Sequence, residues 1–356
     1  MPKYAIDLFA GVGGLSLGFE MSGFDVILAI EYDASIAEAY EYNHPNTNVL
    51  VADITTLPIE KTFSYFKDKT TVIFGGPPCQ GFSQKGQRLK AKDERNFLFH
   101  YFVSVVEYVR PQYFVMENVP NLLTTERSYF KKEIENLFEP QGYKMTFGVL
   151  NAADYGVPQN RRRAVIIGKH NTDLPLNLPT PSCQKVTIWD AISDLAYLNS
   201  GEGMAESDYF LPPTSDYQKK LRTDSERLFN HVSTKHTPIA LERLRMIPPN
   251  CGREVLPSEH RTKSIYSGTW TRMVEEEVSV TITTRFDTPS SGKFTHPFLD
   301  RAITVREAAR LQSFPDRFRF IGTKSSQMKQ VGNAVPPLLA YAIAKTIMED
   351  ILQEDK

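Results

Sequence analysis

The sequence is poor in cysteine and has no long hydrophobic run. Cys79, Cys183 and Cys251 are the only cysteines among 356 residues, too few for a disulfide framework and without the spacing of metal ligands. Apolar runs such as 101–106 fall far short of the ~20 residues that a membrane-spanning helix needs. Residues 1–4 lead directly into an apolar segment, so we expect no signal peptide. These absences predict a protein of the reducing cytoplasm with no membrane segment.

Neither sign of charge dominates, and the sequence has no internal repeat or low-complexity tract. The chain has 41 Lys+Arg and 42 Asp+Glu, a net charge of −1. This balance hides an asymmetry: residues 1–218 hold 19 basic and 26 acidic side chains, residues 219–295 hold 13 and 9, and residues 296–356 hold 9 and 7. The length predicts two domains. The basic segment 219–295 is the better candidate for contact with a polyanion.

Strand and helix patterns alternate through the first half of the chain. This alternation predicts a mostly parallel sheet covered by helices on both faces. After about residue 172 the periodicity fades, and a strand-like stretch follows at 278–283. We expect strands at 4–9, 25–30, 49–51, 71–74, 113–116 and 164–168, and helices at 15–21, 34–42, 96–109, 305–312 and 338–352.

A glycine-rich turn follows the first predicted strand. Gly11, Gly13 and Gly14 would let a ligand approach the backbone closely. Glu31 follows Gly11 by 20 residues, a spacing that suits a carboxylate bound to ribose hydroxyls. Ser16 stands where a dinucleotide fingerprint has its third glycine, so the pattern favours an adenosine group over a pyrophosphate. Asp53, after the third strand, could accept a hydrogen bond from an adenine amine. A tight turn without a ligand is the alternative for the glycines alone.

A cysteine follows the fourth predicted strand, between Pro77-Pro78 and Gln80-Gly81. The carboxyl ends of parallel strands are where open α/β sheets bind ligands. An accessible cysteine at that edge favours a nucleophile, whereas we expect Cys183 and Cys251 to be structural. The basic loop 84–92 follows. It could close over a phosphate backbone or be a solvated surface loop.

Polar side chains also mark the last two predicted strands. Glu117 ends the fifth strand, at the sheet edge predicted for Cys79 and Glu31. A carboxylate there could protonate, or hydrogen-bond to, a ring nitrogen of a heterocyclic substrate, or it could only end a strand. Residues 161–163 are three consecutive arginines before the last strand, and at least one could hold a phosphate or a ring carbonyl.

Taken in order, these segments resemble the motifs of DNA (cytosine-5) methyltransferases of bacterial restriction-modification systems. The resemblance covers nearly the whole chain. Ser313 is a small departure, because the family often has glycine there. The matching segments are 7–14 for S-adenosylmethionine, 77–80 for the catalytic cysteine, 117–119 for the acid, Gln159, Arg161 and Arg163 for the Gln-x-Arg-x-Arg motif, 301–315 for the motif that braces the recognition domain, and 330–337 for the final motif.

The resemblance implies an α/β Rossmann-like, S-adenosylmethionine-dependent methyltransferase fold with a mostly parallel sheet. Residues 1–178 plus 325–356 would form the catalytic and cofactor-binding domain, and 179–324 the smaller, inserted target-recognition domain. The C-terminal helix would fold back against the N-terminal sheet, because Asn333 and Gly11 would share the cofactor. The implied partner is double-stranded DNA, with a functional pairing to a restriction endonuclease. The protein would act as a monomer, in the bacterial cytoplasm at the nucleoid.

The resemblance also assigns chemical roles. Cys79 would add to carbon 6 of a flipped-out cytosine, Glu117 would act at ring nitrogen 3, Arg163 would hold the ring carbonyl, and Arg161 would assist positioning. Carbon 5 would then take the methyl group. The implied cofactor contacts are Phe9, Gly11, Val12, Glu31, Tyr32, Asp53, Ile54, Gly76, Leu98, Asn333 and Ala334; the DNA-binding candidates are Gln80, Ser83, Lys85, Arg88, His231, Arg243, Arg245, Arg253, Arg261, Lys263, Arg272 and Arg285.

The sequence leaves two alternative functions open. Relatives of this fold modify transfer RNA, so an RNA cytosine-5 methyltransferase is one. The basic segment between Gln159 and Arg301 argues for DNA, because sequence readout needs such a module. The other is a catalytically silent DNA-binding relative, which the presence of Cys79, Glu117, Arg161 and Arg163 argues against.

Overall fold

The computed structural model describes residues 2–78, 96–124, 129–182, 185–263 and 267–354. The chain forms two compact units. Unit 1 contains residues 1–151, 162–181 and 337–356, and unit 2 contains 152–161 and 182–336. The division after residue 181 lies near the predicted boundary at 178, whereas the division after residue 336 lies beyond the predicted boundary at 325. The units differ from the predicted domains in that 152–161 and helix α11 (Lys324–Asn333) belong to unit 2. The roles predicted for the two domains stay predictions.

Unit 1 is built on one seven-stranded sheet in the order β3-β2-β1-β4-β5-β7-β6. The strands from β3 to β5 are parallel, and β7 runs antiparallel to both β5 and β6. The predicted α/β fold with a mostly parallel sheet is confirmed. The strands are β1 (Tyr4–Asp7), β2 (Asp25–Glu31), β3 (Asn48–Val51), β4 (Val72–Gly75), β5 (Tyr113–Asn118), β6 (Tyr143–Asn151) and β7 (Arg162–His170).

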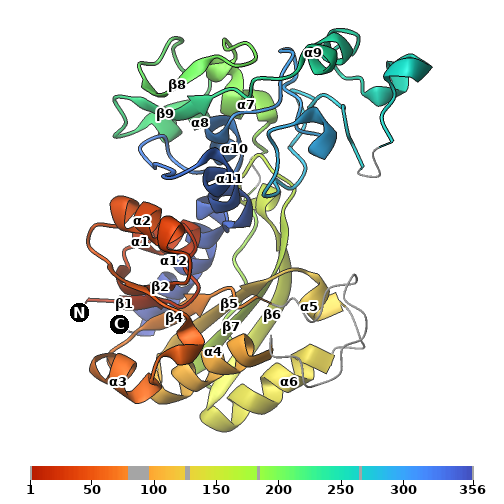
Figure 1. Ribbon diagram of the computed structural model, residues 1–356. Helices are drawn as coiled ribbons and strands as arrows, with labels where there is room; N and C mark the ends of the chain where they lie inside the picture. Colours follow the sequence, from red (N-terminus) through yellow and green to blue (C-terminus); the bar gives the residue numbers. More distant parts are fainter. Residues whose placement is uncertain (1, 79–95, 125–128, 183–184, 264–266, 355–356) are drawn as a thin grey trace. The chain divides into compact units, whose positions relative to one another are not determined.

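Helices cover both faces of this sheet (Figure 1). Because both faces are covered, the central strands are buried throughout, as in β4. On one face Phe63, Phe102 and Phe138 join an extended apolar core; on the other, Phe19 stacks on Phe74 at 4.0 Å. The helices of unit 1 are α1 (Gly14–Met21), α2 (Ala34–Asn43), α3 (Ile59–Phe63), α4 (Asn96–Val109), α5 (Asn121–Thr124), α6 (Tyr129–Phe138) and α12 (Pro337–Glu354).

The C-terminal helix α12 returns to pack against α1, as predicted. A Cβ placed on Gly18 would lie 2.4 Å from the Cβ of Ala340, so only glycine allows this approach. At the far end of α12, Asp350 and Glu354 each lie 2.6 Å from the ammonium of Lys169 in β7. Sequence-distant segments therefore complete one sheet-and-helix unit.

Unit 2 has little regular structure outside its helices. The strand expected at 278–283 is not formed; the segment makes a single bridge, between Ser279 and Gln159. Side chains satisfy its backbone instead, because Ile282 donates to Gln159 and accepts from Arg161. The elements of unit 2 are α7 (Ile188–Ile192), β8 (Gly203–Ser207), α8 (Asp216–Arg222), β9 (Leu228–Val232), α9 (Pro238–Arg245), α10 (Val305–Leu311) and α11.

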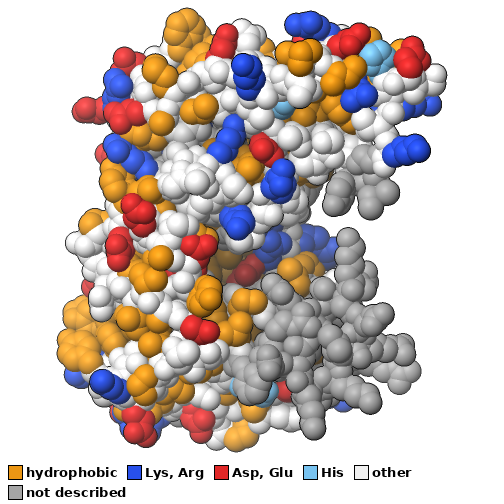
Figure 2. All heavy atoms as spheres, viewed as in Figure 1, with side chains coloured by type: hydrophobic (Ala, Val, Ile, Leu, Met, Phe, Trp, Pro, Cys, Tyr) orange, Lys and Arg blue, Asp and Glu red, His pale blue; other side chains and the backbone are white. Residues whose placement is uncertain are grey.

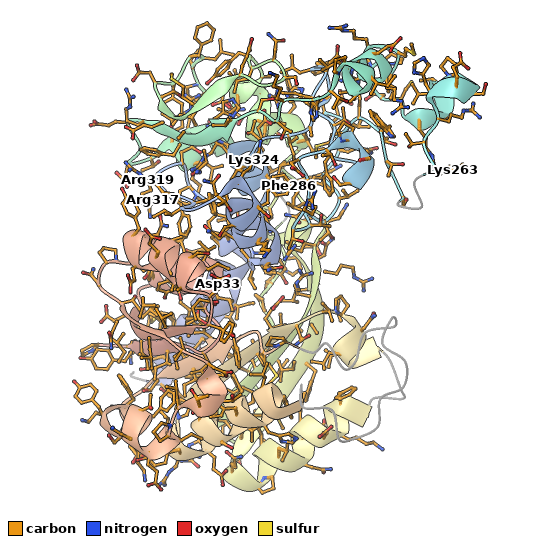
Figure 3. The ribbon with its side chains drawn as sticks, in the orientation of Figure 1. Asp33, Lys263, Phe286, Arg317, Arg319 and Lys324 are labelled. Carbon is orange, nitrogen blue, oxygen red and sulfur yellow. The ribbon has the colours of Figure 1, made fainter. Side chains whose placement is uncertain are left out.

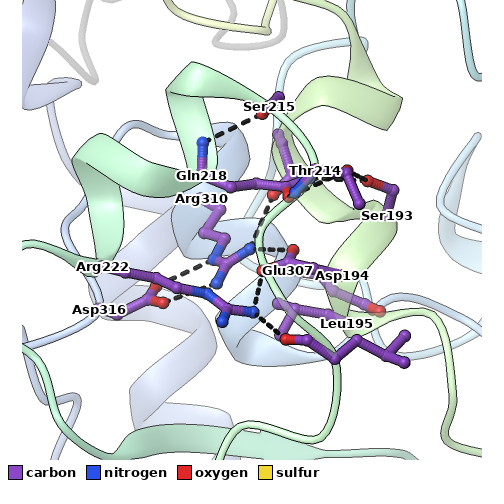
Figure 4. Close-up of polar contacts among 12 residues, drawn as sticks. Ser193, Asp194, Leu195, Thr214, Ser215, Gln218, Arg222, Glu307, Arg310 and Asp316 are labelled. Carbon is purple, nitrogen blue, oxygen red and sulfur yellow. Dashed lines mark hydrogen bonds and ion pairs between the residues drawn. The ribbon is translucent and has the colours of Figure 1, made fainter.

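Helix α10 is buried along its whole length and carries charged side chains inside unit 2. Arg310 lies 2.5 Å from Asp194 and 2.6 Å from Asp316 (Figure 4). Asp194 also pairs with Arg222, and Arg301 pairs with Glu307 at 2.7 Å. Buried charges are tolerated only when paired and hydrogen-bonded. This ion-pair network therefore fixes the segments around α10.

No helix in the described part of the chain is both long and apolar enough to cross a bilayer.

Candidate active site

The glycine-rich turn after β1 is held by the carboxylate at the end of β2. Gly11 and Gly13 have φ angles of +53° and +91°, which disfavour residues with a side chain. The amide of Gly11 donates to Oε2 of Glu31 at 2.8 Å, and the amide of Asp33 donates to Oε1 at 2.8 Å. Burial raises the pKa of Glu31, and these two hydrogen bonds oppose the rise. Glu31 thus joins two loops at one edge of the sheet.

Most predicted cofactor residues follow the carboxyl ends of adjacent parallel strands, where α/β folds bind ligands. Tyr32 is 74% exposed beyond β2. After β3, Asp53 caps a 3-10 turn, η1 (Ile54–Thr56), by accepting from Thr55. Asn333 and Ala334, at the end of α11 in unit 2, stay predictions. Five others follow the same strands in unit 1: Phe9, Gly11 and Val12 after β1, Ile54 after β3, and Gly76 after β4. Leu98 lies in helix α4.

Glu117 and Arg163 form an ion pair across β5 and β7. Nε of Arg163 lies 2.6 Å from Oε1 of Glu117, and the two side chains are 15% and 12% exposed. A Cβ on Gly76 would lie 2.9 Å from Oε2 of Glu117, so the segment after β4 passes directly beside the carboxylate. An ion pair this short, between side chains that are largely shielded from solvent, is stronger than one on an exposed surface. The pair sits at the sheet edge that the sequence predicted.

Asn118 connects this pair to the segment that leads to the predicted nucleophile. Its side-chain amide donates to the carbonyl of Pro77 at 2.8 Å, and its Oδ1 accepts from Val119. No role for Asn118 was predicted from the sequence, although its place directly after Glu117 in the matching segment 117–119 was a signal. Cys79, Gln80, Ser83, Lys85 and Arg88 lie outside the described residues. Their predicted roles therefore stay predictions.

Gln159 and Arg161 are internal braces of unit 2. The amide of Gln159 donates to Gln312 at 2.7 Å. The guanidinium of Arg161, which is 1% exposed, donates to the carbonyls of Ile282 at 3.0 Å and Gly332 at 2.8 Å. These contacts occupy the guanidinium inside unit 2 and speak against direct contact with a substrate; the positioning role of Arg161 stays a prediction. Arg163, two residues later, belongs to unit 1.

Two of the predicted DNA-binding candidates are buried. Arg272 is 3% exposed, and its five N–H groups donate to four backbone carbonyls and the carboxylate of Asp300. His231 contacts Thr304 and the carbonyl of Leu195, and burial lowers its pKa to about 4. Charge counting does not distinguish a buried arginine from an exposed one. This geometry speaks against the DNA contacts predicted for Arg272 and His231.

A small separate core in unit 2 is formed by Leu244, Ile247, Leu256 and Trp270. Arg243 stacks over Trp270 at 5.4 Å. Lys263 lies at the tip of this region (Figure 3), where basic side chains gather among acidic ones (Figure 2). The exposed candidates are Arg245, Arg253, Arg261, Lys263 and Arg285.

The sheet order, the glycine-rich turn and the ligand edge define a Rossmann-like methyltransferase fold. The sequence profile described as C-5 cytosine-specific DNA methylase matches residues 4–349. The chain belongs to this family and is an enzyme that methylates cytosine in DNA.

The relatives agree with this assignment. The chain is 40% identical to the type II methyltransferase M.DdeI of Desulfomicrobium norvegicum, over 96% of this chain and 88% of that protein. It is 39% identical to M1.HphI of Haemophilus parahaemolyticus, over 97% and 86%. A solved Escherichia coli prophage protein, assigned as a DNA modification methyltransferase, has 29% identity and a TM-score of 0.80, with 99% of each chain covered. The Dnmt2 methyltransferase of S. pombe shares the fold, with a TM-score of 0.60 and 16% identity, over 98% of this chain and 99% of that one.

Proposed function

We propose that the protein transfers a methyl group from S-adenosylmethionine to carbon 5 of a cytosine within a specific double-stranded DNA sequence, through a covalent adduct on Cys79. The observation that carries the proposal is the Glu117–Arg163 pair, 2.6 Å apart at the ligand edge of the sheet. It places side by side a carboxyl that could act at ring nitrogen 3 and a guanidinium that could donate to the ring carbonyl of a cytosine.

In the proposed reaction the sulfur of Cys79 bonds to carbon 6 of a cytosine turned out of the duplex. Glu117 protonates or hydrogen-bonds ring nitrogen 3, and Arg163 donates to the ring carbonyl, so both stabilise the charge that develops on the ring. Carbon 5 becomes nucleophilic and takes the methyl group as the bond from that group to the sulfonium sulfur of S-adenosylmethionine breaks, so that S-adenosylhomocysteine leaves. Loss of the carbon 5 proton to a base then expels the thiolate and restores the double bond.

The edge formed by β1, β2 and β3 fits an adenosine-containing donor. Glu31 presents a partly buried carboxylate beside the glycine-rich turn, with Tyr32 and Asp53 exposed next to it. Glu31 would bind the ribose hydroxyls, Tyr32 would contact the adenine ring, and Asp53 would accept from its amine. S-adenosylmethionine supplies an electrophilic methyl group when bound.

Sequence readout is proposed for the exposed basic candidates of unit 2. An arginine bidentate to guanine is the commonest specific contact in the major groove. Exposed Arg245 and Lys263 remain candidates, whereas Arg272 is occupied by carbonyls. Changing a base-reading residue should relax specificity at one position, while changing a phosphate contact should weaken binding to all sequences about equally.

The names of the type II relatives support a role in protecting host DNA from a paired restriction endonuclease. We propose that the protein acts in the cytoplasm as a monomer, because a reader with two unlike units can bind one asymmetric site alone.

Bisulfite sequencing of genomic DNA from Escherichia coli expressing the protein tests this function. We expect protected cytosines at one recurring sequence, absent from cells that express Cys79→Ala. Unprotected DNA together with methylated transfer RNA would contradict the proposal in favour of the RNA alternative. Binding to duplex DNA without any methylation would favour the alternative of a catalytically silent DNA-binding protein.

A further inference from the structure

Three buried polar side chains from three elements form a hydrogen-bonded relay beneath the glycine-rich turn. The hydroxyl of Tyr40 in α2 donates to Oγ of Ser16 in α1 at 2.7 Å. The hydroxyl of Ser16 donates to Oδ2 of Asp7, at the end of β1, at 2.7 Å. All three residues are fully buried. Buried networks whose members are satisfied rigidify the segments that they join.

The relay ends on the turn itself. The amide of Phe9 donates to Oδ1 of Asp7 at 3.4 Å. Burial raises the pKa of Asp7 to about 7, and the hydrogen bond from Ser16 opposes this rise. Removal of the Ser16 hydroxyl would leave the Asp7 carboxyl with one partner fewer inside the protein. We expect the carboxyl then to rotate or to become protonated, and its hydrogen bond with the Phe9 amide to change.

The same helix that supplies Tyr40 packs directly on the turn. A Cβ on Gly13 would lie 2.9 Å from the Tyr40 ring and 2.2 Å from the His44 ring. His44 in turn lies 2.8 Å from Glu20 in α1. Any shift of the Tyr40 ring is therefore transmitted to the backbone at Gly13, because no space separates them.

The amide groups of the turn are bound by partners on two sides. On the inner side, Asp7 accepts from Phe9 and the carbonyl of Ile30 accepts from Ala10. On the other side, Glu31 accepts from Gly11. Two carboxylates thus set the shape of the turn. Glu31 is the one that we propose binds the methyl donor, and Asp7 is buried in the protein interior.

We propose that Ser16 is a positioning residue for the methyl donor: its hydroxyl links Tyr40 to Asp7 and so holds the turn at 9–13 in the shape that binds the donor. Ser16 replaces the third glycine of a dinucleotide fingerprint, whose usual purpose is close helix–strand packing. In this chain the same position adds a hydrogen bond. The inference rests on the proposed function, because it concerns the site where the donor would bind.

The test compares Ser16→Ala and Tyr40→Phe with the wild type. Donor affinity is measured calorimetrically with S-adenosylmethionine in the absence of DNA, and kcat and both KM values are measured on a duplex carrying the methylated sequence. We expect Ser16→Ala to raise the donor Kd and KM about tenfold, the equivalent of ~1.4 kcal/mol, with the DNA KM unchanged. Tyr40→Phe keeps the ring and removes only the hydroxyl, so it should shift the donor KM in the same direction by less.

Ser22→Ala is the matched control. Ser22 directly follows α1, the helix that contains Ser16. Its hydroxyl donates to the carbonyls of Gly18 and Tyr341, away from the turn. It should lower the midpoint of thermal unfolding without changing the donor KM. Donor KM values of both relay variants equal to that of the control would overturn the inference, as would equal changes in the donor and DNA KM. A wild-type protein that transfers no methyl group would instead refute the proposed function.

Discussion

Nε of Arg163 lies 2.6 Å from Oε1 of Glu117, across two antiparallel strands at the ligand edge of the sheet. The guanidinium is planar and its donors point in fixed directions, so it holds the carboxylate in one orientation. Gly76 passes close to the other oxygen of that carboxylate. The pair is therefore already arranged before any substrate enters.

Replacing Glu117 by Gln should abolish most turnover while preserving binding. The amide cannot deliver a proton to ring nitrogen 3, and positioned acid–base groups contribute typically about 10²–10⁴-fold. We expect the rate constant of methyl transfer in a single-turnover experiment to fall by about 10²–10⁴-fold. The affinity for duplex DNA should change little. Glu60→Gln, at an exposed position of α3, is the control and should match the wild type. A Glu117→Gln enzyme with wild-type kcat would remove the acid from the mechanism.

Replacing Glu31 by Ala should weaken binding of the methyl donor and leave the affinity for DNA unchanged. The change removes the acceptor for the Gly11 and Asp33 amides as well as the proposed ribose contact. Hydrogen bonds to charged groups contribute about 1.5–3 kcal/mol, so we expect the donor Kd to rise by roughly 10–150-fold. Calorimetry with S-adenosylmethionine and a duplex-binding assay measure the two affinities. Glu38→Ala, on the exposed side of α2, should change neither, and an unchanged donor Kd in Glu31→Ala would contradict the ribose role.

Replacing Arg310 by Met should destabilise unit 2. The change leaves Asp194 and Asp316 buried without their shared partner, and breaking a buried pair costs about 3–5 kcal/mol. Urea unfolding followed by tryptophan fluorescence reports on this unit, because Trp189 and Trp270 both lie in it. The exposed Arg317→Met should stay within about 0.5 kcal/mol of the wild type. Equal free energies of unfolding for the two variants would show that the network does not stabilise the unit.

Unit 2 should lose stability in acid before its carboxylates are protonated. Burial lowers the pKa of His231 to about 4 and that of His296 to about 3, against about 6.5 in an unfolded chain. Below about pH 6.5 the unfolded state therefore binds more protons, so stability falls as the pH drops toward these folded pKa values. The same urea experiment at several pH values between 7.5 and 4.5 should show this loss, with a shallower slope for His231→Gln. A free energy of unfolding independent of pH across this window would contradict the burial of these rings as neutral groups.

The sheet of unit 1 was predictable because its parallel strands are covered on both faces and read as short apolar runs, as in 72–75. The edge strand β6 was missed, because only Tyr143 and Leu150 within it are buried and no alternation marks it. The stretch at 278–283 had the composition of a strand, but its backbone is bound by Gln159 and Arg161. Strand propensity is a local property, so it cannot predict hydrogen bonds from side chains more than a hundred residues away in the sequence.

The candidate site divides in a similar way. Glu31 and Glu117 could be placed from the strand ends that they follow, since topology brings those ends to one edge. The recognition residues could not, because sequence shows charge and not burial. Arg272 and Arg245 look equivalent in the sequence, yet one is 3% exposed and bonded to carbonyls and the other is exposed.

The central claim is a transient bond between the sulfur of Cys79 and carbon 6 of a cytosine. A duplex carrying 5-fluorocytosine at the methylated position tests it most directly, because fluorine cannot leave as the carbon 5 proton does. With S-adenosylmethionine present, the account predicts an irreversible, denaturation-resistant protein–DNA complex for the wild type and none for Cys79→Ala. A wild-type enzyme that methylates normal DNA but forms no such complex would contradict the covalent mechanism.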